Sequence, residues 1–194
     1  KKNNLLLAEA TIFNYHKGFN IIKKIIGNKK NLIHIQSNFN IPVIKKPSEI
    51  KTIDGDNLMD MSPYAAAIIR LFFKKNFNIH IKKYFYNNTK LVKNFYILCE
   101  NKKLSYFGNF GTEREYLSEI KFFTSKKIIS INHQAFAIPS NKKIPLSIKE
   151  NNKYKKIYLP KDDSIKNFID DILRSIKNKK YNDYYNKIYN DAHI

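Results

Sequence analysis

The chain has 194 residues, enough for one domain with a sizeable core, and 43% of them are hydrophobic and recur in short patterned runs, which excludes a disordered chain. No apolar run reaches the roughly 18 residues that a membrane-spanning helix needs. The formal charge of +20 rests on evenly spread lysines, and only three of the 36 basic residues are arginine, so the charge indicates an AT-rich genome and argues against a nucleic-acid partner.

The first residues and the single cysteine bear on the cellular compartment. The opening "KKNNLLLAEA" has no full hydrophobic region and no small-residue cleavage site, so it predicts a strand rather than a signal peptide. Cys99 is the only cysteine, and its strand-like setting "KNFYILCE" predicts a small buried hydrophobic side chain. Because no internal disulfide is possible, we expect a reducing compartment, and hence a cytoplasmic protein with no membrane partner.

In chain order, the first half alternates between strand and helix. A short apolar run over residues 4–12 predicts a strand buried on both faces, and residues 14–28 carry apolar side chains at helical spacing up to a glycine that ends the helix. Residues 31–42 alternate and end at a proline, as a strand does. Residues 43–56 have little period and predict a loop of a length that is often functional.

The second half is a run of strands followed by helices. Between residues 77 and 160, short polar turns join apolar runs, which favours antiparallel hairpins. Residues 161–194 then carry apolar side chains at helical spacing, after three candidate N-cap residues: Asp162, Asp163 and Ser164. The order of elements predicts an α+β fold, with helices packed on one face of a large, mostly antiparallel sheet.

Motifs for several classes of site are absent from the sequence. There is no GxGxxG or GxxxxGK[ST] phosphate loop, and no GxSxG setting that supports a hydrolase triad. There is no CxxC or HExxH, and the five histidines show no ligand spacing, so we expect no metal site. Motifs of this kind therefore indicate only an α+β domain.

One apolar helix carries polar groups at its start. In "GDNLMDMSPYAAAIIRLFF", residues 55–73, Asp60 and Tyr64 are four residues apart and share a helix face, where a carboxylate and a phenol both reach one substrate. The alternative is an N-terminal helical aspartate and a core tyrosine. The Ser62-Pro63 step also fits an N-cap and a first helical residue, and a helix that starts there leaves Asp60 outside it.

Three stretches, in the same order and with compatible gaps, resemble the catalytic domain of the Gfo/Idh/MocA family of oxidoreductases. "AEATIFNYHKGFNIIKKII" is similar to the family's "EAFMYRFHPQ" and the helix after it, and "IDGDNLMDMSPYAAAIIRLFFKK" to "GGGALLDLGCYPVxxARLLFG". "FGNFGTEREYLSEIKFFTSKKIISINHQAFAIP" resembles "FGFDxxYxxxLEIWGSKGxIxxxRAFTPP", found in members that act on sugars and nucleotide sugars. Together the three matches cover most of the chain.

The resemblance implies roles for the residues that match the family's positions. Asp60 and Tyr64 take the catalytic positions: Tyr64 donates a proton to the carbonyl oxygen as hydride arrives, or takes it in reverse, and Asp60 orients the sugar. His16 and Asn14 map to substrate-binding positions. For His16, a helix-entry histidine whose hydrogen bonds are satisfied locally is the alternative.

The resemblance also sets the expected domain boundaries. Asp56 and Asn57 replace family glycines, and they either contact substrate hydroxyls or, as we favour, cap the helix. The family's opening Rossmann domain, which binds NAD or NADP and carries a catalytic lysine, has no counterpart here, so no cofactor-binding residue is assigned. Residues 1–10 resemble the last strand of that domain, and residues 11–194 the substrate-binding and dimerising domain.

The resemblance therefore implies a fragment of an NAD(P)-dependent sugar or nucleotide-sugar dehydrogenase or ketoreductase, at work in carbohydrate metabolism. We expect it to form a homodimer through its sheet and to be inactive without the Rossmann domain. The alternative is a non-catalytic sheet domain that serves oligomerisation or binding. A basic nucleic-acid module is a third possibility, and its binding would show a steep salt dependence.

Overall fold

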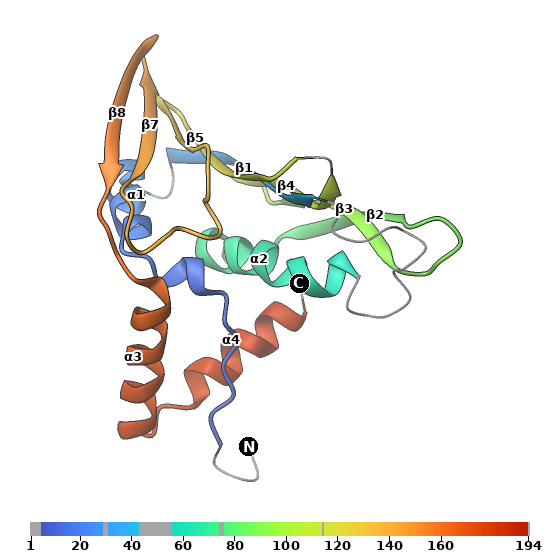
Figure 1. Ribbon diagram of the computed structural model, residues 1–194. Helices are drawn as coiled ribbons and strands as arrows, with labels where there is room; N and C mark the ends of the chain where they lie inside the picture. Colours follow the sequence, from blue (N-terminus) through green and yellow to red (C-terminus); the bar gives the residue numbers. More distant parts are fainter. Residues whose placement is uncertain (1–4, 29–30, 43–55, 74–75, 114, 194) are drawn as a thin grey trace.

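Figure 1 shows the computed structural model, which describes residues 5–28, 31–42, 56–73, 76–113 and 115–193. One eight-stranded sheet forms the body of the molecule, and the α-helices lie on one side of it (Figure 1). The predicted α+β class, with helices on one face of a large sheet, is therefore confirmed.

The sheet is antiparallel except at its centre. Its strand order is β2-β3-β4-β1-β5-β6-β7-β8, and of the neighbouring pairs in the described strands only β1 and β4 are parallel. The three predicted hairpin turns join β3 to β4, β5 to β6 and β7 to β8. The strands are β1 (Leu32–Pro42), β2 (Asn78–Phe85), β3 (Val92–Glu100), β4 (Ser105–Glu113), β5 (Leu117–Thr124), β6 (Lys127–Ile131), β7 (Ile144–Glu150) and β8 (Lys153–Leu159).

Alternation along the central strands separates an inner face, covered by helices, from an outer face. In β1, for example, Ile35, Ser37 and Phe39 are buried, whereas Gln36 and Asn38 between them are partly exposed. The predicted alternation in this strand is therefore confirmed, and it tells which side chains belong to the core.

Helix α2 (Asn57–Phe72) begins earlier than the serine-proline step suggested. Asp56 is its N-cap, with a carboxylate oxygen that accepts hydrogen bonds from the backbone N–H groups of Leu58 at 2.9 Å and Met59 at 3.4 Å. Pro63 thus lies inside the helix, where it cannot donate a backbone hydrogen bond to the carbonyl four residues before it and its ring crowds that carbonyl.

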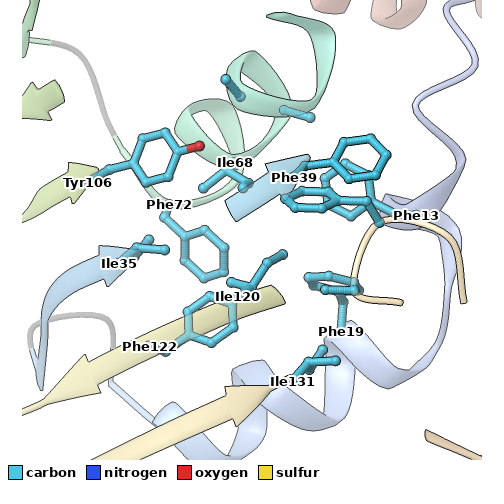
Figure 2. Close-up of a cluster of buried hydrophobic side chains, with 14 of the residues drawn as sticks. Phe13, Phe19, Ile35, Phe39, Ile68, Phe72, Tyr106, Ile120, Phe122 and Ile131 are labelled. Atoms are coloured by element: carbon cyan, nitrogen blue, oxygen red, sulfur yellow. The ribbon is translucent and has the colours of Figure 1, made fainter. Parts of the chain in front are cut away.

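The core lies between α2 and the inner face of the sheet. Figure 2 shows Ile68 and Phe72 of α2 pointing toward Ile35, Ile120 and Phe122 of the strands. The ring centroids of Phe72 and Phe122 are 5.2 Å apart, and all five side chains are buried. Burying each such side chain contributes roughly 1.5–3 kcal/mol, so this contact holds α2 firmly against the sheet.

The segment predicted as a helix over residues 14–28 is divided in two. A 3₁₀ turn, η1 (Ile12–Tyr15), comes first, and α1 (Gly18–Ile26) follows it. Gly27, at a φ of 70°, ends α1 as predicted, because this left-handed conformation strains any residue with a Cβ atom.

Two further helices close the chain. Helix α3 (Ser164–Lys177) begins after Asp163, which of the three predicted candidates is the N-cap. Helix α4 (Asn182–Ala192) packs against α2 and is joined to α3 by a hydrogen bond that the Tyr184 hydroxyl donates to Asp171 at 2.6 Å. The N-terminal segment runs past α4 (Figure 1), where the Tyr185 hydroxyl donates a hydrogen bond to the carbonyl of Leu5.

Other predictions had mixed outcomes. The strand predicted over residues 4–12 is absent from residues 5–11: their backbone is irregular, Leu5 and Leu7 are exposed, and no described strand lies beside them to share hydrogen bonds. Cys99 is buried as predicted. The loop predicted over residues 43–56 lies outside the described residues apart from its last. Among the described helices, none is long and apolar enough to cross a membrane.

Candidate functional site

The Tyr64 ring is held on three sides by phenylalanines. Its centroid lies 5.0 Å from that of Phe39, 5.6 Å from that of Phe136 and 6.0 Å from that of Phe13. These rings come from β1, from the segment after β6 and from η1, so three separate elements fix the ring's orientation. Tyr64 itself is only partly buried.

Several acidic groups surround the Tyr64 hydroxyl. Burial raises the pKa of Tyr64 above its ordinary value, and the nearby Tyr116, Asp60 and Glu9 raise it further, in that order of effect. Asp60 lies one turn before Tyr64 on α2 and is exposed, so the two predicted catalytic residues do share a helix face. The phenol is therefore kept neutral at physiological pH.

A neutral phenol beside a carboxylate suits one direction of chemistry. It holds a proton ready for an oxygen that gains negative charge, such as the carbonyl oxygen of a ketone under reduction. Ionising it places a further negative charge near Asp60 and Glu9, so the phenolate form is disfavoured. A catalytic role for Tyr64 and Asp60 stays a prediction.

Asp56 and Asn57 have structural contacts. Asp56 caps α2, as favoured from the sequence. Asn57 is buried, and its side-chain amide donates hydrogen bonds to the carbonyl of Lys93 and, at 2.6 Å, to the hydroxyl of Thr112. Asn57 therefore ties the start of α2 to β3 and β4, and any contact of either residue with a substrate stays a prediction.

His16 is buried at the entry to α1. Its Nδ1 accepts a hydrogen bond from the backbone N–H of Gly18 at 3.0 Å, which is the local arrangement considered as the alternative. Burial lowers the pKa of His16, an effect that Asp162 opposes and Lys17 adds to. The imidazole is therefore neutral at pH 7, with its proton on Nε2, and a substrate contact through Nε2 stays a prediction.

Asn14 lies at a different place from Tyr64, in the wall of a cavity of about 160 Å³. Glu9, Arg70 and Lys187 line the same cavity. The Arg70 Nε donates to Asp191 of α4 at 2.9 Å, in an ion pair whose side chains are mostly buried. The candidate residues therefore fall into two groups, one around Tyr64 and one around this cavity.

Sequence reasoning missed two residues that the fold brings to Tyr64. Glu9 comes from the N-terminal segment and Tyr116 from just before β5, about fifty residues away on either side. A glutamate in an otherwise apolar opening segment was a signal for the first. No pattern in the sequence marked Tyr116. Glu9 also reaches the cavity, so it connects the two groups.

The described glycines do not form a phosphate cradle for a dinucleotide. A Cβ atom at Gly108, in the middle of β4, would collide with the side chains of Tyr106 and Phe110, so this glycine serves packing within the sheet. At Gly18, the first residue of α1, the backbone N–H is already bonded to His16. Neither of these two described glycines therefore offers the close backbone approach that a dinucleotide phosphate needs.

Comparisons with known proteins bear on the fold. The sequence matches no protein-family model and no curated protein. The structure does match solved ones: KijD10, a 3-ketoreductase from Actinomadura kijaniata in complex with NADP and TDP-benzene, is 17% identical, with a TM-score of 0.85 over 98% of this chain and 61% of that chain. UDP-N-acetylglucosamine 3-dehydrogenase GnnA from Acidithiobacillus ferrooxidans is 16% identical, with a TM-score of 0.70 over 91% and 54%.

The fold is thus that of the C-terminal domain of KijD10-like enzymes, an eight-stranded α+β domain. KijD10 and GnnA are sugar-modifying oxidoreductases of the Gfo/Idh/MocA type, whose motifs the sequence resembles. At 14–17% identity the likeness shows a shared fold, and the chain spans about 60% of the length of the KijD10 chains it matches.

Proposed function

We propose that this chain is the substrate-binding and dimerising domain of an NAD(P)-dependent oxidoreductase that acts on a ketone or carbinol of a sugar or nucleotide sugar. The observation that carries the proposal is Tyr64, a neutral phenol clamped by three phenylalanines with Asp60 one turn away, on a fold shared with KijD10 and GnnA. KijD10 was solved with TDP-benzene, and GnnA is a dehydrogenase of UDP-N-acetylglucosamine.

In this proposal Tyr64 is the general acid. Its hydroxyl gives a proton to the carbonyl oxygen of the substrate, and the rings of Phe39 and Phe136 hold it in position. Asp60, exposed at the start of α2, accepts hydrogen bonds from sugar hydroxyls and so orients the reacting carbon. At neutral pH the phenol is protonated, which is the form that gives a proton to a ketone oxygen.

The described residues do not supply a cofactor site, so the proposal assigns NAD or NADP to a Rossmann domain outside this chain. Residues 1–10 then belong to the last strand of that domain, and residues 11–194 form the domain described here. A strand in that position needs the parent sheet as its hydrogen-bonding partner, which agrees with the irregular backbone of residues 5–11. By itself the chain is expected to bind substrate without turnover.

The outer face of the sheet is the proposed dimer interface. None of the described helices covers it (Figure 1). Tyr96 and Phe107 stack there at 5.9 Å, and with Leu98, Ile81 and their neighbours they line a shallow hollow of about 360 Å³. An apolar surface of this kind on a sheet is typical of an interaction site. We expect Phe107→Lys to convert a dimer into a monomer in analytical ultracentrifugation.

The test of the catalytic proposal starts with the coding sequence that precedes Lys1. We expect it to continue in frame into a glycine-rich Rossmann domain, and the resulting protein to oxidise NADH or NADPH with a keto nucleotide sugar. Tyr64→Phe then lowers kcat by roughly 10²–10⁴-fold, the usual contribution of general acid catalysis. A start codon directly before Lys1, with no such domain beside it, contradicts the proposal and favours the non-catalytic sheet domain.

A further inference from the structure

The cavity behind α2 is built by segments from both ends of the chain. It holds about 160 Å³, and its walls come from residues 9–15, from the last turns of α2 and from α4. Since three segments far apart in sequence form the walls, the tertiary fold fixes the shape of the cavity.

Two oxygen atoms in this region are buried without a hydrogen-bond donor. Glu9 shares a hydrogen bond with Thr11, but its Oε1 atom has no partner in the described part of the chain. The Oδ1 atom of Asn14 is in the same condition. Buried polar atoms are nearly always paired, so these two acceptors indicate a molecule that donates hydrogen bonds inside the cavity.

The charges around the cavity are balanced. Arg70 is paired with Asp191, and the ammonium of Lys187 lies 4.7 Å from the ring centroid of Tyr184 and 3.5 Å from the hydroxyl of Tyr15. With Glu9, this makes two carboxylates against two cations. Glu9 therefore repels an anion in the cavity, and Arg70 and Lys187 repel a cation. Neither kind of ion is favoured over a neutral molecule.

We propose that this cavity binds a small neutral polyol, whose hydroxyl groups donate to Glu9 and Asn14 and accept from Lys187. A hydroxyl both donates and accepts a hydrogen bond, which matches a wall that presents orphaned acceptors on one side and an ammonium on the other. Leu71 and Ile188 supply apolar surface for the carbon skeleton. Tyr64 does not line the cavity, so the proposal stands independently of ketone reduction.

Glu9 connects this cavity to Tyr64. Its charge is one of those that raise the pKa of the phenol.

Saturation-transfer NMR on the 194-residue chain tests the proposal, with glycerol, erythritol and myo-inositol as neutral probes and methylphosphonate and ethylammonium as charged ones. We expect saturable binding of at least one polyol and weaker binding of both charged probes. Glu9→Gln removes a charged acceptor and should weaken polyol binding at least fivefold, since charge-assisted hydrogen bonds are about twice as strong as neutral ones. Glu119→Gln, on the outer face of the sheet, is the matched control and should bind like the native chain.

A second variant keeps the test decisive if Glu9→Gln folds poorly. Ile188→Phe adds a ring to the cavity wall and should abolish polyol binding while the circular dichroism spectrum is retained. The proposal is overturned if no polyol binds, if a charged probe binds more tightly than every polyol, or if the folded Ile188→Phe chain binds polyols as the native chain does.

Discussion

The two halves of α2 hold their polar groups in opposite ways. In the first half, Tyr64 is surrounded by aromatic rings, and burial and nearby acids raise the pKa of its hydroxyl. Near its end, Arg70 is held by an ion pair with Asp191 beside a polar cavity. The first arrangement positions a proton donor through packing, and the second joins α4 to the body through charge.

This difference separates the residues that set geometry from those that set charge. Around Tyr64, a smaller side chain lowers stability because it leaves a cavity in the packing. Around Arg70, removing one charge lowers stability because it leaves an opposite charge buried without its partner. Substitutions around Tyr64 and around Arg70 should therefore destabilise the protein for different physical reasons.

Removing a ring beside Tyr64 should have the largest effect. Phe136 is 1% exposed and its ring contacts Phe13, Phe39 and Tyr64, so Phe136→Ala should lower the free energy of unfolding by about 4 kcal/mol through lost burial and a new cavity. Urea unfolding followed by circular dichroism measures this. Tyr154→Ala, which removes a ring that is 75% exposed on β8, is the control and should cost far less.

Breaking the ion pair at the other end should have the next largest effect. Arg70→Met keeps much of the side-chain volume but removes the ion-pair partner of the mostly buried Asp191, and we expect the free energy of unfolding to fall by about 3 kcal/mol. In the double variant Arg70→Met/Asp191→Asn, much of the lost stability should be recovered. If the two single losses simply add in urea unfolding, the ion pair does not couple α2 to α4.

The fold was predictable wherever apolar and polar side chains followed a single regular spacing along the sequence. The alternation in β1 and the short hairpin turns placed the strands, because side chains on a half-covered sheet must alternate. The start of α2 was ambiguous because a serine-proline step imitates an N-cap, while the true cap, Asp56, precedes it by several residues. The parallel pairing of β1 with β4 was beyond prediction, because pairing partners distant in sequence leave no local pattern.

The protonation of Asp191 gives the region around Arg70 a pH-dependent stability. Burial raises the pKa of Asp191 to about 6, against the attraction of Arg70, while Glu9 raises it further and Lys187 lowers it. The folded chain then binds this proton more readily than the unfolded chain, so the contribution of Asp191 to stability grows as the pH falls from about 6 to about 4.

Comparing the native chain with Asp191→Asn isolates the contribution of Asp191 to the pH dependence of stability. The pKa values of His16 and Asp162 are lowered, so these groups reduce stability as the pH falls, and both the native chain and the variant contain them. The stability of the native chain relative to Asp191→Asn should therefore rise by on the order of 1 kcal/mol between pH 7 and pH 4.5. A difference that stays constant in urea unfolding at the two pH values contradicts a raised pKa for Asp191.

The smallest effect on stability should come from the candidate catalytic hydroxyl. Tyr64→Phe keeps the ring among the three phenylalanines and removes an oxygen from a partly exposed side chain, so we expect a change below about 1 kcal/mol. Tyr106→Phe is the control, because that buried hydroxyl hydrogen-bonds Ser37 at 2.9 Å and its removal should cost more. Thermal unfolding of both variants gives the comparison.

The candidate site was only partly predictable. The spacing of Asp60 and Tyr64 placed them on one helix face, and a resemblance to a family marked them as catalytic. The neighbours that set the charge state of Tyr64, Glu9 and Tyr116, come from other elements and meet it only through the tertiary fold. Sequence spacing identifies neighbours on one helix face, but it does not identify residues that distant segments bring together.

The most direct test of the account is the binding of nucleotide sugars to the chain itself. Isothermal titration calorimetry with TDP-glucose and UDP-N-acetylglucosamine should show one saturable site for at least one of them. Tyr64→Phe should weaken that binding several-fold without changing the fold, whereas Phe107→Ala should leave it unchanged. If neither nucleotide sugar binds, or if Tyr64→Phe binds as the native chain does, Tyr64 does not belong to a substrate site and the central claim fails.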